Sequence, residues 1–176
     1  MKSNIEQIAL EFARKWHKGQ YRKDNITPYI NHPVDVVSLL KEWGVNDNAS
    51  IAAAYLHDLL EDTNVKEATI RQVFGPNILN KVKKLTKEEN QNKDEYIKNI
   101  AKDSDIYVLL IKYADRISNT LDFILDGNFD WGEKYFHKAD VIYNRLKSES
   151  KVLGKILPKV IKDHNEVLKI FETYNS

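Results

Sequence analysis

The sequence predicts an all-α protein that forms one domain over residues 1–176. Apolar side chains recur at the i, i+3, i+4 spacing of an amphipathic helix in successive segments of the chain. Single glycines and prolines separate these segments, as is typical of short turns between helices. No stretch of useful length alternates apolar and polar residues, so the pattern gives no sign of a β-strand. The absence of internal repeats, low-complexity segments and linkers favours a single domain.

The first two predicted helices lie on either side of a polar loop. Apolar residues spaced from Ile5 to Trp16 predict a helix that ends before Gly19. The loop then reads GQYRKDNITPYINHP. Its last residue, Pro33, suits the first turn of a second helix, which we expect to stop at Gly44.

The middle of the chain is predicted to form three helices. They span residues 49–60, 68–74 and 77–85. Asp47 or Asn48 caps the first of them, and its three consecutive alanines allow close packing against a neighbour. Gly75-Pro76 separates the other two, and the Lys-, Glu- and Asn-rich stretch 86–93 predicts a loop.

The remainder of the chain is predicted to form four helices. They span residues 94–101, 105–125, 130–148 and 151–174. Asp94 caps the first, and Ser104 or Asp105 starts the second, which Gly127 ends. Pro158 breaks or kinks the last helix. No motif is recognisable after residue 127, and the aromatic residues expected to pack there are Trp131, Tyr135, Phe136 and Tyr143.

The composition is that of an intracellular domain close to electrical neutrality. The chain has 27 basic and 26 acidic side chains, a net charge of +1. This balance, with no basic stripe, argues against nucleic-acid binding. Unbroken apolar runs such as Ile51–Leu56 are far shorter than the roughly 20 residues of a membrane helix, and the N-terminus has no apolar signal-peptide core. We therefore expect a cytoplasmic protein without membrane or nucleic-acid partners, and no feature indicates its oligomeric state.

Several kinds of active site are excluded by residues and motifs that the chain lacks. With no cysteine it has no disulfide, no zinc–thiolate site and no Cys nucleophile. Its six glycines are scattered singly, so there is no dinucleotide-binding or Walker loop, and no G-x-S-x-G elbow is present. Any metal ion must be held by His, Asp or Glu side chains.

Metal-ligating side chains stand out at four positions. They are His32, His57, Asp58 and Asp115. Two imidazoles and two carboxylates suit a divalent ion such as Mn, Fe, Mg or Zn. Considered alone, the His57-Asp58 pair is better explained as a hydrogen-bonded core histidine at the end of an apolar helix. His32, next to Pro33, has an equally simple explanation as a helix entry.

Asp115 favours the metal interpretation. It lies in the segment YVLLIKYADRISN, whose apolar residues must be largely buried. An unpaired buried carboxylate is costly, so Asp115 requires Arg116, Lys112 or a metal ion as its partner.

A second acidic pair follows His57-Asp58 in the segment AAAYLHDLLEDT. In a continuous helix, Glu61 lies one turn above His57 and Asp62 one turn above Asp58, about 5.4 Å along the axis. That offset is large for a direct ligand but allows contact with a metal-bound water, where one carboxylate could act as general base. The alternative is that the pair simply solvates a helix end.

The order of the candidate ligands is the pattern of the HD phosphohydrolase superfamily. The segments GQYRKDNITPYINHP, AAAYLHDLLEDT and KYADRISN resemble the three signature segments of the hydrolase domain of RelA/SpoT alarmone enzymes and of stand-alone small alarmone hydrolases. The resemblance implies a single HD-domain helical bundle. It also implies hydrolysis of the 3′-diphosphate of ppGpp or pppGpp to GDP or GTP and pyrophosphate.

The resemblance further implies roles for individual positions. The family's ligands for one divalent ion, usually Mn²⁺ although other divalent metals suit the same donors, match His32, His57, Asp58 and Asp115. The catalytic acidic pair matches Glu61 and Asp62. The candidate substrate-binding residues are Arg22, Lys23, Lys112, Asn119 and Asp122.

Among the substrate-binding candidates, Arg22 and Lys23 match a loop that holds the guanine face and the phosphates, and Asn119 matches a residue near the ribose. After the asparagine the family often continues Leu-Arg-Thr, whereas this chain reads Thr-Leu-Asp and loses the arginine. The new acid, Asp122, is expected to face the base, because it would repel phosphates. The resemblance therefore implies a small-molecule nucleotide as substrate. Two alternatives to ppGpp hydrolysis remain: an HD-type phosphatase acting on NADPH or another nucleotide, and a non-catalytic nucleotide-binding module.

Overall fold

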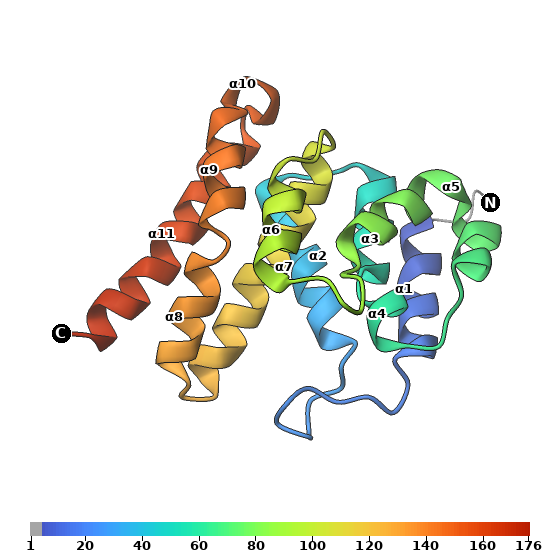
Figure 1. Cartoon of the computed structure of the whole chain (residues 1–176), viewed down its shortest axis with the longest axis horizontal. Coiled ribbons are helices and arrows are strands. Elements are labelled where there is room, and N and C mark those ends of the chain that lie inside the picture. Colours follow the sequence, from blue (N-terminus) through green and yellow to red (C-terminus); the bar gives the residue numbers. More distant parts are fainter. Residues whose placement is uncertain (1–4) are drawn as a thin grey trace.

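Helices account for the regular structure of residues 5–176, the part of the chain that the computed structural model describes (Figure 1). Residues 1–4 of the predicted domain lie outside this part. The helices are α1 (Ile5–Trp16), α2 (Asn31–Trp43), α3 (Asn48–Leu56), α4 (Leu59–Asp62), α5 (Glu67–Leu85), α6 (Lys93–Ala101), α7 (Ile106–Leu125), α8 (Phe129–His137), α9 (Asp140–Ser148), α10 (Ser150–Leu153) and α11 (Ile156–Tyr174). Within the described residues the only strand-like pairing is an isolated bridge between Tyr21 and Pro28. The predicted all-α class is confirmed.

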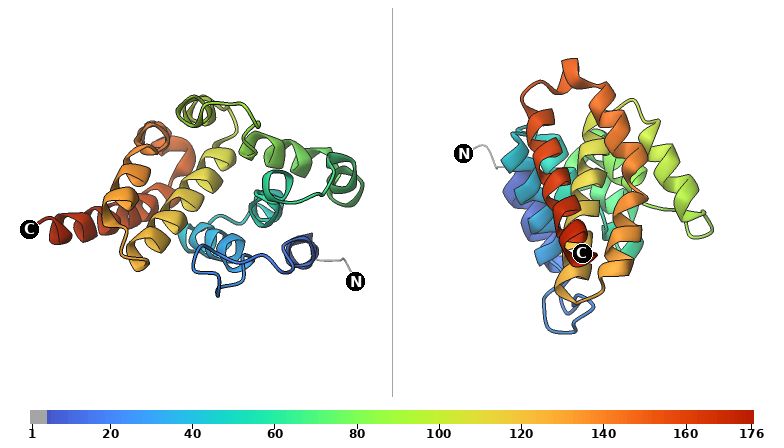
Figure 2. Two further views of the ribbon diagram at one scale, coloured as in Figure 1. Left: turned by 60° about the horizontal axis from the view of Figure 1, so that its bottom comes forward. Right: turned by 90° about the vertical axis from the view of Figure 1, so that its left-hand side faces the viewer.

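Helix α7 forms the centre of the molecule. Every residue from 108 to 118 on this helix is buried, and α7 packs against α2, α3, α5, α6, α8, α9 and α11. In Figures 1 and 2, helices α1, α3 and α5 lie to one side of α2 and α7, and helices α8, α9 and α11 lie to the other. None of the helices within residues 5–176 is both long enough and apolar enough to cross a membrane. The central position of α7 places its residues between the helices on one side of the molecule and those on the other.

Several predicted helix ends are confirmed together with their turn chemistry. The side chain of Asp47 accepts a hydrogen bond from the amide of Ser50 and caps α3, and Asp105 caps α7 in the same way. Gly44 follows α2 with a φ of 96°, a left-handed conformation that favours glycine. Gly75, with a φ of 80°, interrupts α5 where two short helices were predicted.

The predicted helix over 49–60 is wrong in one respect that matters for the site. The chain forms two helices, α3 and α4, and residues 57 and 58 form the turn between them. The ring Nδ1 of His57 donates to the backbone carbonyl of Ala54 at 2.8 Å. The His57 side chain thereby satisfies a backbone carbonyl at the end of α3. Helix α4 then begins with backbone hydrogen bonds to the carbonyl of Asp58.

Three details of the later helices are also corrected. The cap of α6 is Asn92 rather than Asp94, because the Asn92 side chain accepts from two following amides. The predicted helix over 130–148 is two helices, α8 and α9. Phe136 and Ile142 are both buried, and they would lie about 120° apart around one continuous helix. The turn between α8 and α9 brings both residues into the core.

The last predicted helix breaks earlier than expected. Gly154, with a φ of 50°, separates α10 from α11, whereas Pro158 lies in the first turn of α11, where its missing amide breaks no helical hydrogen bond. Of the aromatic residues expected to pack, Phe136 and Tyr143 are buried, but Trp131 is 70% exposed.

Candidate metal centre and active site

Three separate elements bring the four predicted metal ligands together. His32 lies in the first turn of α2, His57 and Asp58 form the α3–α4 turn, and Asp115 lies midway along α7. One ligand atom from each of His32, His57 and Asp58 lies within 4.8 Å of the others. The Oδ1 atom of Asp115 lies 3.1 Å from Nε2 of His32 and 3.8 Å from Nε2 of His57. We call these four residues the His/Asp cluster.

The orientation of His57 fits the residue to a metal ion. Because its Nδ1 donates to the carbonyl of Ala54, that nitrogen carries the proton and Nε2 is left to face the cluster. Nε2 is buried, has no hydrogen-bond partner and lies 3.1 Å from Oδ1 of Asp58. Two acceptor atoms at that distance require a proton or a cation between them. The donor set and the unpartnered nitrogen therefore fit a divalent cation.

The charges of the His/Asp cluster lead to the same conclusion. Burial alone would lower the pKa of His57, but Asp58 and Asp115 outweigh it and raise this pKa to about 10. Burial alone would raise the pKa of Asp58, but His57 and His32 hold it well below its usual range. The pKa of Asp115 is likewise held low against burial, chiefly by Lys112. The cluster thus keeps two carboxylates ionised and attracts positive charge.

Two neighbours on α7 hold Asp115 in place. Nζ of Lys112 lies 2.8 Å from Oδ2 of Asp115, and Nδ2 of Asn119 donates to Oδ1 at 2.5 Å. Of the partners that the sequence offered for Asp115, Lys112 is the one it contacts among side chains, whereas Arg116 lies over the ring of Tyr135 at 4.1 Å. Lys112 is buried against Asp115 and does not line the cleft described below, unlike the other substrate-binding candidates.

The two predicted catalytic carboxylates diverge. Oδ2 of Asp62 accepts a hydrogen bond of 2.6 Å from the hydroxyl of Tyr29, which also lies 2.8 Å from Oδ2 of Asp58. Asp62 is therefore connected to the His/Asp cluster through one phenol. Oε2 of Glu61 instead accepts from the backbone amide of Lys87, in the loop between α5 and α6, at 3.2 Å. The expected stacking is confirmed for Asp62, whose amide donates to the Asp58 carbonyl at 2.8 Å and whose carboxylate shares the Tyr29 hydroxyl with Asp58. It is wrong for Glu61, whose amide bonds to the Asp58 carbonyl rather than to that of His57 and whose carboxylate is directed away from the cluster.

A cleft of about 450 Å³ opens beside the His/Asp cluster. Its walls come from the loop before α2, from the end of α4 and from the last turns of α7. The lining residues include Arg22, Lys23, Tyr29, Asp62, Asn119 and Asp122. Tyr29 and Asp62 both line the cleft, and the Tyr29 hydroxyl contacts Asp58, so this wall of the cleft is one side chain away from the His/Asp cluster.

The basic side chains of the cleft are held by partners from α7. Nε of Arg22 donates to Oδ2 of Asp122 at 3.0 Å, and its NH2 group contacts Asp122 and donates to Oδ1 of Asn119 at 2.7 Å. Nζ of Lys23 lies 3.9 Å from the centre of the Phe123 ring. Asp122 is therefore paired with Arg22, and its expected orientation toward a bound base stays a prediction.

Two tyrosines at the site were not identified by the sequence analysis. Tyr29 lies within the first signature segment, three residues before His32, and that proximity was the one available signal. Tyr135, expected only to pack, lies against Arg116 and Phe123. Burial and the nearby charge of Asp115 raise its pKa to about 12. No motif pointed to Tyr135, because it comes from α8, after the last signature segment.

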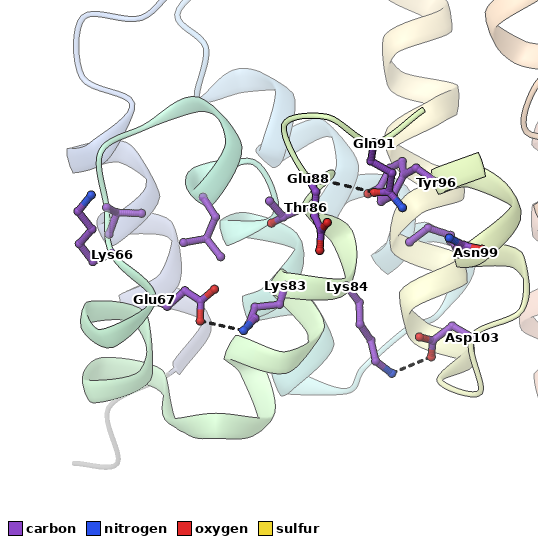
Figure 3. Close-up of a pocket in the computed structure, with 13 residues that line it drawn as sticks. Lys66, Glu67, Lys83, Lys84, Thr86, Glu88, Gln91, Tyr96, Asn99 and Asp103 are labelled. Atoms are coloured by element: carbon purple, nitrogen blue, oxygen red, sulfur yellow. Dashed lines mark hydrogen bonds and ion pairs between the residues drawn. The ribbon is translucent and has the colours of Figure 1, made fainter. Parts of the chain in front are cut away.

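A larger hollow of about 610 Å³ lies between α4, α5 and α6 (Figure 3). Lys83 in this hollow pairs with Glu67 at 2.9 Å, and Lys84 pairs with Asp103 at 2.8 Å. None of the predicted metal-binding, catalytic or substrate-binding residues lines it. Size alone therefore does not locate the site, and the smaller cleft is the one next to the His/Asp cluster.

The chain is similar to known proteins over most of its length. A family model described as HD domain matches residues 9–146. The guanosine-3′,5′-bis(diphosphate) 3′-pyrophosphohydrolase MESH1 of Drosophila melanogaster is 31% identical over 87% of this chain and 90% of its own. The protein of the same name from Xenopus tropicalis is 35% identical over 84% of this chain and 88% of its own. A solved structure described as a metazoan ortholog of SpoT that hydrolyzes ppGpp superposes with a TM-score of 0.76 at 27% identity, covering 94% of this chain and 97% of that one.

Proposed function

The chain belongs to the HD domain family, a fold of metal-dependent phosphohydrolases, and from this membership we propose that it hydrolyses the 3′-diphosphate of ppGpp or pppGpp to give GDP or GTP and pyrophosphate. The observation that carries the proposal is that the His/Asp cluster lies next to a cleft with basic side chains. The His/Asp cluster adjoins, through Tyr29 and Asp62, a cleft that presents Arg22 and Lys23. The names of the relatives that match over most of their length support the choice of substrate.

The residues that would hold the metal ion are the four of the His/Asp cluster. An HD domain implies a divalent metal, and we propose one Mn²⁺ ion in this protein. When bound, such an ion polarises a phosphoryl oxygen and lowers the pKa of a coordinated water. Asn119 and Lys112 keep Asp115 in the orientation in which its Oδ1 faces the two histidines.

Asp62 is the residue placed to act on the attacking water. It lies in the wall of the cleft, and its carboxylate is oriented by the Tyr29 hydroxyl. We assign it the role of general base, which accepts a proton as water adds to the phosphorus attached to the ribose 3′ oxygen. The bond between that phosphorus and the 3′ oxygen breaks, the 3′ oxygen takes a proton from solvent to leave as a hydroxyl, and Asp62 returns its own proton to solvent. Glu61 is assigned a supporting role, since its carboxylate contacts the backbone of Lys87.

Arg22, Lys23 and Asn119 are assigned to the nucleotide. The planar guanidinium of Arg22 lies 5.4 Å from the centre of the Tyr29 ring and is held by Asp122 and Asn119, so its face is fixed before a base arrives. Lys23 presents its ammonium group from the same loop, over the ring of Phe123, and this compact charge suits a phosphate.

The experiment is product analysis with the purified, Mn²⁺-loaded protein and a panel of ppGpp, pppGpp, NADPH and GTP. We expect GDP and pyrophosphate from ppGpp, and no turnover after chelation until Mn²⁺ is restored. Efficient hydrolysis of NADPH with ppGpp untouched would reject the proposed substrate. Binding of ppGpp by titration calorimetry without any product would instead identify a non-catalytic nucleotide-binding module.

A further inference from the structure

We infer that Tyr29 is a positioning residue of the reaction, which acts by holding Asp62 next to the His/Asp cluster. The inference rests on the proposed function, because it concerns the residue assigned as general base. Tyr29 has no assigned role in the sequence analysis, and its ring and its hydroxyl face different partners. The hydroxyl is the part that carries the inference.

The hydroxyl of Tyr29 lies between two carboxylates. Its oxygen is 2.6 Å from Oδ2 of Asp62 and 2.8 Å from Oδ2 of Asp58. A phenol has one proton, so it can donate to only one of these acids at a time. The other contact places two oxygen lone pairs against each other unless positive charge is present at that acid. Asp58 belongs to the cluster that attracts a cation, so the phenol proton is available to Asp62.

The surrounding residues fix both the donor and the acceptor. The ring of Tyr29 stacks on His17 with centroids 4.7 Å apart, and its backbone amide donates to the carbonyl of Gln20 at 2.9 Å. The side chain of Gln20 in turn donates to the backbone carbonyl of Asp62 at 2.7 Å and contacts Nδ1 of His17 at 2.6 Å. His17 and Gln20, which belong to the same loop as Tyr29, thus hold the Tyr29 phenol and the Asp62 backbone in a fixed relation. Preorganisation of this kind is what a general base requires.

The hydroxyl and the ring of Tyr29 can be separated by one substitution. Tyr29→Phe keeps the ring that stacks on His17 and lies beneath Arg22, and removes only the hydrogen bonds to the acids. A role in nucleotide binding through the ring would therefore survive the change, whereas a role in holding Asp62 would not.

The test compares Tyr29→Phe with the wild type in kinetics and in Mn²⁺ binding. We expect kcat for ppGpp to fall about 10- to 100-fold, a part of the roughly 10²- to 10⁴-fold that a general base contributes, because Asp62 is still present but is no longer held. KM should stay within about threefold, because the nucleotide contacts remain. Mn²⁺ affinity, measured by titration calorimetry without substrate, should also stay within about threefold, because the phenol proton is assigned to Asp62 and the four ligands of the cluster are intact.

The matched control is Tyr113→Phe. This variant also removes a phenol hydrogen bond, in this case a buried one of 2.6 Å to His164, away from the cleft. It should lose thermal stability to a similar degree and keep its kcat. If both variants lose kcat equally, the effect of Tyr29→Phe is general destabilisation and the inference is wrong.

A double-mutant cycle shows whether Tyr29 acts through Asp62. In the Asp62→Asn background, Tyr29→Phe should lower kcat by less than about twofold, because the group it positions is already lost. An undiminished effect in that background, or an unchanged kcat for Tyr29→Phe alone in an active enzyme, would overturn the inference. If the wild-type protein hydrolyses no ppGpp, the proposed function fails first and the inference fails with it.

Discussion

At the scale of single residues, the site separates two neighbouring acids that the sequence presents as a pair. Asp62 is directed to the His/Asp cluster through Tyr29, and Glu61 is directed to the loop after α5. Neighbouring positions on a helix lie about 100° apart around the axis, so two adjacent side chains readily reach different surroundings. The two acids are therefore expected to contribute unequally.

The first prediction concerns these acids. Asp62→Asn should lower kcat by about 10²- to 10⁴-fold, the usual contribution of a general base, while leaving Mn²⁺ occupancy unchanged. Glu61→Gln should have a smaller effect on kcat, again with the metal retained. Steady-state kinetics and metal analysis of the same preparations measure both. Glu172→Gln, an exposed carboxylate on α11, is the control. Loss of metal from Asp62→Asn as complete as from His57→Ala would contradict the assigned role.

The second prediction concerns Arg22. Its guanidinium hydrogen-bonds to Asp122 and Asn119 in the cleft wall rather than to a predicted metal ligand. Arg22→Ala should therefore raise KM for ppGpp by about tenfold and change kcat little, because it removes binding that is equal in the ground state and the transition state. Hydrolysis of a small phosphate ester without a base should be unaffected. Arg14→Ala, on the exposed surface of α1, serves as the control. A large fall in kcat with unchanged KM would place Arg22 in the chemical step instead.

At the scale of elements, two local features make contacts with residues far away in the sequence. They are the turn between α3 and α4 and the packing of α11 against α7. The α3–α4 turn presents His57 and Asp58 side by side to the cluster. On the other side of α7, the buried His164 of α11 shares a hydrogen bond of 2.6 Å with the hydroxyl of Tyr113. Its ring stacks on that of Tyr143, with the ring centroids 3.6 Å apart. This contact ties the last helix to the central one.

The third prediction is a pH dependence of stability that His164 causes. Burial lowers the pKa of His164 below its usual value of 6.5. The unfolded chain then binds a proton more readily than the folded one, so the free energy of unfolding falls as the pH drops below about 6.5. Chemical denaturation of the wild type and of His164→Phe, which keeps an aromatic ring in the stack, should show a weaker decrease between about pH 7 and pH 5 in the variant. An identical decrease in both proteins would show that His164 contributes nothing to it.

At the scale of the whole molecule, the His/Asp cluster connects parts of the chain that are far apart in sequence. Its ligands come from α2 and α7 in the middle of the fold and from the α3–α4 turn on one side of them (Figure 1). An ion bound there would be lost on global unfolding, because the unfolded chain does not keep these donors together. Metal binding and folding stability should therefore be coupled.

The fourth prediction follows from that coupling. Mn²⁺ at about 100 times its dissociation constant should stabilise the protein by about 2.7 kcal/mol, seen as a higher midpoint of thermal unfolding. The increase should disappear in His57→Ala and persist in Asp62→Asn, since only the former removes a ligand. An equal increase in His57→Ala would mean that Mn²⁺ binds elsewhere on the protein.

The sequence determined the features that depend on local periodicity and residue chemistry. Helical spacing predicted α1, α2 and α7, and turn and cap residues such as Asp47, Gly75 and Asp105 marked correct boundaries. The order His, His-Asp, Asp and the three signature segments predicted the family, which the match over residues 9–146 confirms. These features are readable because each is fixed by residues a few positions apart.

The tertiary structure decided which atoms of distant residues meet. Tyr29 and Asp62 are 33 positions apart, and Arg22 and Asp122 are 100 apart, so no local pattern indicates either contact. The breaks at residues 57–58 and between α8 and α9 were missed for the same reason, since their causes include the burial of residues against other helices. Differences in local free energy between alternative conformations are small along the chain, so contacts between elements decide which alternative is adopted. The choice of Asp62 over Glu61 as the acid beside the cluster is one such selection.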